Sequence, residues 1–234
     1  MLKHLLIITC LVFCGHLSAE KTQLLLIRHG ETGWNQEKRA IGHADATLNQ
    51  TGLAQAKQLA LQLKKKHPEI VAIYASDLSR AVSTAQEAAE LLLLPISLRP
   101  SLREIKWGAV EGMLSSEIHE LYAEKTKMLD EMYPEREERW NHATFEGAET
   151  YNQLLARVKG EVLAIAERHP GEKVAIFTHS KTIKVLIMEL TGYAEKNIFV
   201  DNCSTAIFEY DPDQPDQPLL FVGIQKLEQP TKTP

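Results

Sequence analysis

Cysteine is scarce in this chain, with three residues at positions 10, 14 and 203 among 234. Cys10 and Cys14 lie in an apolar N-terminal segment, so the remainder of the chain holds one cysteine and cannot form an internal disulfide bond. The sequence also lacks the Cys/His spacing of structural zinc sites. We therefore expect neither a disulfide framework nor a bound metal, and Cys203 is expected to be a small packed residue.

An excess of positive charge is also missing, because 26 Lys and Arg residues stand against 31 Asp and Glu residues, for a formal net charge of -5. Proteins that grip nucleic acid do so through basic surfaces, so no nucleic-acid partner is expected, and any anion site must be local. The chain is 44% hydrophobic and has no internal repeat. Its length and composition are typical of one globular domain.

No apolar run is long enough for a transmembrane helix, which needs about 20 residues. Residues 1–19 instead have the order of a signal peptide, with Lys3, an apolar core from Leu5 to Phe13, and a cleavage site near Ala19. Export to the periplasm or the medium is expected, without stable membrane insertion after removal of the signal. Two alternatives are a buried first strand and a lipid anchor on Cys14.

Strand-like and helix-like segments alternate through residues 20–228. Short apolar runs at 22–27, 70–76 and 95–98 alternate with helical patterns at 49–67 and 79–93, and the order recurs after residue 173. This order predicts an α/β fold, a three-layer sandwich with a mostly parallel central sheet covered by helices. Residues near 114–149 are charged, with helical periods, and are interpreted as a helical insertion over the site. Residues 229–234 are expected to form a flexible tail.

Two histidines occupy matching places in this pattern. His29 and His179 each follow an apolar strand, and ligands of open α/β sheets bind at the carboxyl ends of the strands. The pair is therefore expected to lie at one site, whereas the other histidines of the domain are expected to be ordinary surface or core residues.

Two arginines strengthen this interpretation. Arg28 precedes His29, and Arg80 is expected in the first turn of a helix capped by Ser76, Asp77 or Ser79. A cation is unfavourable there, but a bound anion would reverse the sign of the effect. Because guanidinium groups match phosphate oxygens in bidentate geometry, a phosphate is the simplest explanation of both arginines.

Four segments in order resemble the histidine phosphatase superfamily, also called the phosphoglycerate mutase-like family, over about residues 22–210. They are RHGETGWN at 28–35, SDLSRAVSTAQ at 76–86, LREIKWGAVEG at 102–112 and FTHS at 177–180. The resemblance implies a phosphohistidine mechanism that needs neither metal nor cofactor.

The residue roles implied by the resemblance also make physical sense. His29 would be the nucleophile, and Glu104 would donate a proton to the leaving group and later activate water. The phosphoryl oxygens would be held by three side chains and a supporting amide: Arg28, Arg80, His179 and Asn35. Glu111 is expected to be structural.

One position departs from the family pattern. Many members have glycine after the second histidine, where this chain has Ser180. Its hydroxyl group would either donate a hydrogen bond to the substrate or narrow the pocket.

The predicted function is that of an exported, metal-independent phosphomonoesterase acting on a small phosphorylated substrate. A phosphoglycerate mutase would need further positive groups over the pocket, and Arg136 and Arg139 lie in an acidic stretch that favours ion pairs instead. A catalytically weak member that only binds phosphorylated ligands is the second alternative. The oligomeric state cannot be predicted from these features.

Overall fold

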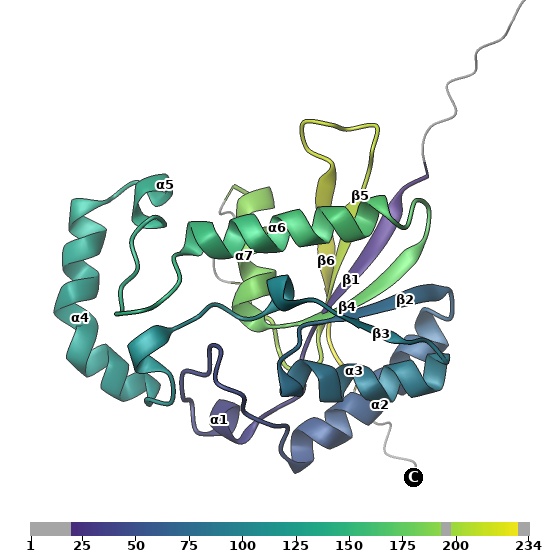
Figure 1. Ribbon diagram of the computed structural model, residues 1–234, viewed down its shortest axis with the longest axis horizontal. Coiled ribbons are helices and arrows are strands. Elements are labelled where there is room, and N and C mark those ends of the chain that lie inside the picture. The colour runs from purple at the N-terminus through teal and green to yellow at the C-terminus, as the bar shows by residue number, and fades with distance from the viewer. Residues whose placement is uncertain (1–19, 193–197, 229–234) are drawn as a thin grey trace, which may run out of the picture.

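Six strands form one mixed sheet in the computed structural model, which describes residues 20–192 and 198–228 (Figure 1). The strand order is β3-β2-β4-β1-β5-β6. β3, β2, β4 and β1 run parallel to one another, whereas β5 pairs antiparallel with both β1 and β6. The predicted, mostly parallel α/β sheet is therefore confirmed. The strands are β1 (Thr22–Arg28), β2 (Ile70–Ala75), β3 (Ile96–Leu98), β4 (Lys173–Thr178), β5 (Thr205–Tyr210) and β6 (Leu219–Gln225).

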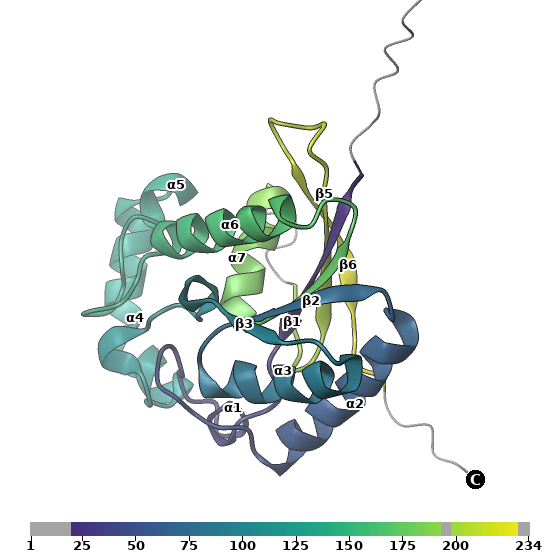
Figure 2. The same ribbon diagram turned by 45° about the vertical axis from the view of Figure 1, so that its right-hand side comes forward.

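Helices cover both faces of the sheet (Figures 1 and 2). Leu24 and Leu26 of β1 pack in one core cluster with α6 (Tyr151–Glu167) and α7 (Ser180–Leu190). Leu25 and Ile27 pack in the other with α2 (Gln50–Lys66) and α3 (Ser79–Leu92). Because alternate residues of a strand point to opposite faces, a strand covered on both sides must be apolar throughout. This explains the uninterrupted run LLLI.

The helical spacing of Leu53, Ala56, Leu59, Ala60 and Leu63 predicts one apolar face of α2, and this prediction is correct except at its start. Ala56, Leu59, Ala60 and Leu63 are buried, but the side chain of Leu53 is 39% exposed. Asn49 caps the helix by accepting a hydrogen bond from the backbone N–H of Gly52. The first turn packs beside the backbone of Gly30 and Glu31 instead of the sheet, so Leu53 has no apolar layer to enter.

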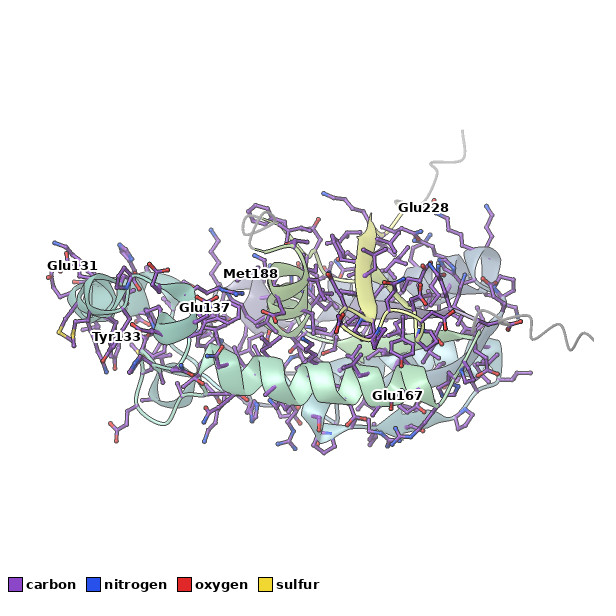
Figure 3. All side chains as sticks on the ribbon, turned by 90° about the horizontal axis from the view of Figure 1, so that it is seen from above. Glu131, Tyr133, Glu137, Glu167, Met188 and Glu228 are labelled. Carbon is purple, nitrogen blue, oxygen red and sulfur yellow. The ribbon has the colours of Figure 1, made fainter. Side chains whose placement is uncertain are left out.

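The charged stretch 114–149 holds α4 (Ser115–Met132) and α5 (Arg136–Arg139). These helices lie beside the N-terminal end of α6, away from the sheet, and in Figure 3 Glu131 and Tyr133 mark one extreme of the molecule. Leu129 is the one buried residue of α4. The helix is therefore loosely attached by apolar contacts, unlike α2, α3, α6 and α7.

The loop after β1 packs closely against α2. A Cβ atom on Gly52 would lie 2.0 Å from the backbone oxygen of Glu31, so no side chain fits there. Three short helical elements complete the fold: α1 (Gly33–Gln36) after β1, and the 3-10 helices η1 (Pro100–Leu102) and η2 (Gly108–Val110) after β3.

We predict that Gly52→Ala lowers the free energy of unfolding by about 2 kcal/mol, because backbone must move to admit the methyl group. Denaturant titration would measure the change. Gly160→Ala is the matched control, since Gly160 lies inside α6 with no atom within 4 Å of an added Cβ. The control should stabilise the protein by up to about 1 kcal/mol through helix propensity. Equal effects of the two substitutions would contradict this account of the loop.

Candidate active site

The carboxyl ends of β1 and β4 bring His29 and His179 together. The two strands pair in parallel with Arg28 opposite Thr178, and the next residue of each strand is a histidine. Their ring centroids are 5.2 Å apart, and the rings are inclined by 60°. Neighbouring parallel strands therefore place in contact two residues that are 150 positions apart in sequence.

One hydrogen bond fixes the tautomer of His29. Its Nδ1 lies 2.7 Å from the backbone oxygen of Gly30, and a carbonyl oxygen can only accept. Nδ1 therefore carries the proton, and Nε2 of the neutral ring keeps its lone pair. This is the form that a nucleophilic imidazole requires.

Burial keeps both imidazoles neutral. The pKa of His29 is lowered well below its ordinary value of 6.5 by burial and then by the positive charges of Arg80 and Arg28. Burial and the charge of Arg80 also lower the pKa of His179 well below 6.5. Lowering these values favours the unprotonated rings, so the nucleophilic form of His29 persists as the pH falls through 6.5.

Ser76, the first residue of the segment SDLSRAVSTAQ, holds the ring of His179. Its Nε2 lies 2.8 Å from Oγ of Ser76, whereas Nδ1 is buried with no hydrogen-bond partner among the described residues. Of the seven predicted site residues, it alone does not line the small hollow described below, and it is fully buried. Its Nδ1 is the ring atom left free to bond a ligand.

The two arginines are held by neutral groups. Arg28 donates from Nη1 to the backbone oxygen of Val200, and Arg80 donates to the backbone oxygens of Gly42 and Ala44. In the part of the chain described here, neither guanidinium forms an ion pair, and the buried Nε atoms of both have no partner. Burial lowers the pKa of Arg80 to about 10, so its side chain remains a cation at neutral pH. Two cations whose hydrogen bonds go to neutral groups make the site attractive to an anion.

The predicted capping of α3 is wrong. Its N-cap residue is Leu78, whose side chain has no atom that can accept a hydrogen bond from the backbone. Ser76 bonds His179, Asp77 forms a bidentate ion pair with Arg103, and the N–H of Ser79 donates to the carboxylate of Asp45. The polar residues before α3 are therefore engaged in holding neighbouring segments in place.

The carboxylate of Glu104 lies against the N-terminus of α7. Its carboxylate accepts hydrogen bonds from the backbone N–H groups of Lys181 at 3.1 Å, Thr182 at 3.2 Å and Ile105 at 3.0 Å. The N-terminus of a helix attracts negative charge, so this position suits a carboxylate. The same contacts give Glu104 a structural role as a partner of the α7 N-terminus.

Arg157 fixes the segment that carries Glu104, a role that sequence reasoning missed. From α6, its Nη1 donates to the backbone oxygens of Ser101 and Arg103, and Nη2 donates to that of Glu104. The guanidinium is itself held by the carboxylate of Glu149. No local signal in the sequence separates Arg157 from other helical arginines, because its three acceptors are backbone atoms some 55 residues away.

Further residues hold the loop that follows β1 and carries His29. Asn202 donates from Nδ2 to the backbone oxygen of His29, and the Thr84 hydroxyl accepts from the N–H of Gly30 while donating to the backbone oxygen of Arg80. Cys203 is fully buried, as predicted, and its N–H donates to the backbone oxygen of Arg28. Backbone contacts of this kind leave no pattern in the sequence.

Asn35 and Ser180 both line the hollow. Asn35 forms a capping box with Thr32 at the start of α1, which uses its side-chain oxygen and leaves the amide nitrogen to donate. Ser180 is the first residue of α7. Glu111 has a structural role, because its carboxylate accepts from the backbone N–H groups of His43 and Trp107.

A hollow of about 150 Å³ joins these groups, which is small compared with the pockets that hold whole cofactors. Larger hollows lie along α4, and neither His29 nor His179 lines them. No three His, Cys, Asp or Glu side chains are grouped as metal ligands within residues 20–192 and 198–228. Six of the lining residues are not among the predicted site residues: Arg39, Ala40, Ile41, Gly42, Trp107 and Lys181. The complete lining is Arg28, His29, Asn35, Arg39, Ala40, Ile41, Gly42, Arg80, Glu104, Trp107, Ser180 and Lys181.

The family model of the histidine phosphatase superfamily (branch 1) matches residues 24–221. The chain belongs to the histidine phosphatase superfamily. Among its relatives, a metal-independent phosphoserine phosphatase of Arabidopsis thaliana is 33% identical over 175 residues, covering 74% of this chain and 70% of that one. The phosphoglycerate mutase-like protein 4 of the same plant is 31% identical over 195 residues, covering 82% and 81%.

Comparison with solved structures also finds this fold. The crystal structure of a phosphoglycerate mutase from Bacillus anthracis superposes with a TM-score of 0.75 at 24% identity, covering 88% of this chain and 93% of that one. At this identity the likeness concerns the fold. The histidine phosphatase assignment therefore rests on the sequence matches, and the structure agrees with it.

We predict that Arg157→Met lowers kcat by about tenfold or more, because the segment bearing Glu104 loses three backbone hydrogen bonds and becomes mobile. A change in kcat that exceeds the change in KM would distinguish positioning from lost substrate binding. Arg168→Met is the matched control, since Arg168 follows the same helix at its C-cap. An Arg157→Met enzyme with unchanged kcat and normal thermal stability would refute this role.

Proposed function

We propose that this protein is a metal-independent phosphomonoesterase that forms a phosphohistidine on His29. The observation that carries the proposal is the neutral ring of His29, with its free Nε2 beside two buried, unpaired arginines. A nucleophile that stays neutral next to a strong anion site suits attack on a phosphate ester.

In the proposed first step, Nε2 of His29 attacks phosphorus, the ester P–O bond breaks, and the leaving oxygen takes a proton from Glu104. Arg28 and Arg80 stabilise the charge on the equatorial oxygens, assisted by Nδ1 of His179. In the second step, Glu104 takes a proton from water, the hydroxide attacks phosphorus, and the P–N bond breaks to release inorganic phosphate. Glu104 is thereby reprotonated and His29 regenerated.

Hydrolysis is favoured over mutase activity by the ion pairs of the insertion. Arg136 pairs with Glu137 and Glu189, and Arg139 pairs with Asp130. Neither lines the small hollow, so neither adds charge there to retain a phosphoglycerate after transfer. The further cations that line it are Lys181 and Arg39, and Arg39 is paired with Glu37. Relatives with phosphatase names support the same choice, although others carry mutase names.

We predict that inorganic phosphate is released from phosphomonoesters in the presence of EDTA, and that His29→Ala lowers kcat by at least about a thousandfold because it removes the nucleophile. Glu104→Gln should lower kcat by about a hundredfold or more, since the amide cannot exchange a proton. The Gln side-chain oxygen can still accept hydrogen bonds at the start of α7, so folding should be preserved.

The pH profile gives an internal check on the same assay. Because the pKa of His29 is lowered, kcat/KM should not decline through a histidine titration near 6.5 as the medium is acidified. Faster interconversion of phosphoglycerates than phosphate release would identify a mutase. Binding of phosphorylated ligands without turnover would identify a binding protein.

We also propose that the protein is exported by residues 1–19, which lie outside the described residues. Among the residues that the structure does describe, no helix is sufficiently long and apolar to cross a bilayer. Expression of the full chain with fractionation of the cells and intact mass analysis should find a product that lacks the first 19 or so residues outside the cytoplasm. A full-length chain retained in the cytoplasm would end the export proposal.

A further inference from the structure

An apolar groove of about 400 Å³ lies between α4 and the body of the domain. Its walls carry Trp107, Val110, Ile118, Phe145 and Tyr151. An apolar cavity of about 150 Å³ can hold a benzene ring, so this groove has room for a larger group. Few apolar contacts hold α4 in place, since it buries Leu129 alone.

The groove adjoins the hollow that contains His29. Ala40 and Trp107 line both, so the two share a wall. Trp107 also lies three residues after Glu104, on the segment that Arg157 fixes. A leaving oxygen must approach Glu104 to receive its proton, and the groove therefore begins where the alcohol part of an ester would emerge.

Arg139, the charged residue that lines the groove, already has hydrogen-bond partners within the protein. Arg139 donates from Nε to Asp130, from Nη1 to the backbone oxygen of His142 and from Nη2 to Oγ1 of Thr144. The groove thus offers a guest no uncommitted charge from this side chain. The groove is lined instead by aromatic side chains, among which Phe145 packs edge to face against Trp107, with ring centroids 6.0 Å apart.

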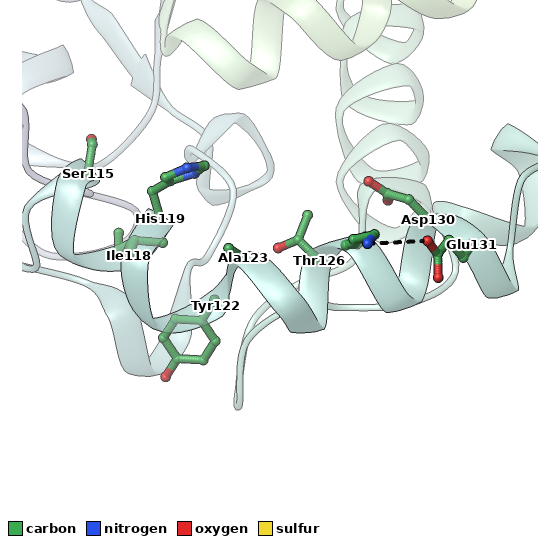
Figure 4. Close-up of a pocket in the computed structure, with 9 residues that line it drawn as sticks. Ser115, Ile118, His119, Tyr122, Ala123, Thr126, Asp130 and Glu131 are labelled. Carbon is green, nitrogen blue, oxygen red and sulfur yellow. Dashed lines mark ion pairs between the residues drawn. The ribbon is translucent and has the colours of Figure 1, made fainter.

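The groove also extends along α4. Ser115, Ile118 and Thr126 line a second hollow on this helix, and Figure 4 shows their side chains among those spaced along it. The second hollow is lined by α4 alone and includes Lys127, Asp130 and Glu131. Its charged lining distinguishes it from the apolar groove that meets the site.

Building on the proposed phosphatase activity, we propose that the groove is a binding site for the leaving group, and that the preferred substrates are phosphate monoesters of alcohols with an aromatic or bulky apolar part. The small hollow takes the phosphoryl group, and Trp107, Phe145 and Ile118 bind the apolar part. Compact, charged esters such as phosphoserine leave the groove empty and gain nothing from it.

The test compares kcat/KM for butyl phosphate, 4-phenylbutyl phosphate and phosphoserine. The two alkyl esters have leaving alkoxides of similar basicity, so a difference between them reports binding of the ring and not the chemical step. We expect 4-phenylbutyl phosphate to exceed butyl phosphate by about tenfold or more, from burial of the ring. Phosphoserine should be the poorest of the three.

Phe145→Ala should reduce this preference to about twofold or less while leaving turnover of butyl phosphate unchanged, because the lost ring lies outside the small hollow. Ile118→Ala serves if the first variant folds poorly. Leu121→Ala is the matched control, since its side chain is 67% exposed on the same helix and lines neither hollow. The control should keep the full preference.

The outcomes separate the groove from the enzyme activity. Turnover without the expected preference, or with a preference that survives Phe145→Ala and Ile118→Ala, overturns the leaving-group site and leaves the phosphatase intact. If no ester is hydrolysed, the phosphatase proposal fails, and calorimetry with butylphosphonate and 4-phenylbutylphosphonate decides the groove. Tighter binding of the phenyl compound, lost in Phe145→Ala, supports the groove, whereas equal binding overturns it.

Discussion

Parallel pairing of β1 with β4 is the constraint on which the site depends. It places Arg28 opposite Thr178 and makes His29 and His179 the first residues beyond the two strands. Both strands are buried on both faces, so their register cannot slip without moving apolar side chains out of two core clusters. The N–H of His29 also donates to the backbone oxygen of Thr178, which fixes the nucleophile directly to the neighbouring strand.

A second framework holds the carboxylate against the histidines. The segment that carries Glu104 is fixed from α6 by Arg157, and the hydroxyl of Thr178 donates to the backbone oxygen of Leu102 at its start. The carboxylate itself is bound by the first N–H groups of α7, the helix that follows His179. The carboxylate of Glu104 and the second histidine are thus positioned by the same helix, which limits their relative movement.

The electrostatics of the site follow from burial without pairing. Arg28 and Arg80 are bound by backbone oxygens, so their charges stay available for a phosphoryl group and also keep the neighbouring imidazoles unprotonated. Glu104 is the nearby negative group and bonds backbone N–H donors. Cations that attract an anion and histidines that stay neutral are therefore two consequences of one arrangement.

The sequence by itself determined the α/β class, the superfamily and the segments that carry His29, Arg80, Glu104 and His179, because period-two and period-3.6 patterns and short motifs are local properties. Tertiary structure decided what depends on long-range contacts: the backbone acceptors of Arg157, the exposure of Leu53, the partners of the polar residues that precede α3 and the groove beside Trp107. These features arise where segments distant in sequence meet, and carbonyl oxygens and the space between side chains have no letter in the sequence.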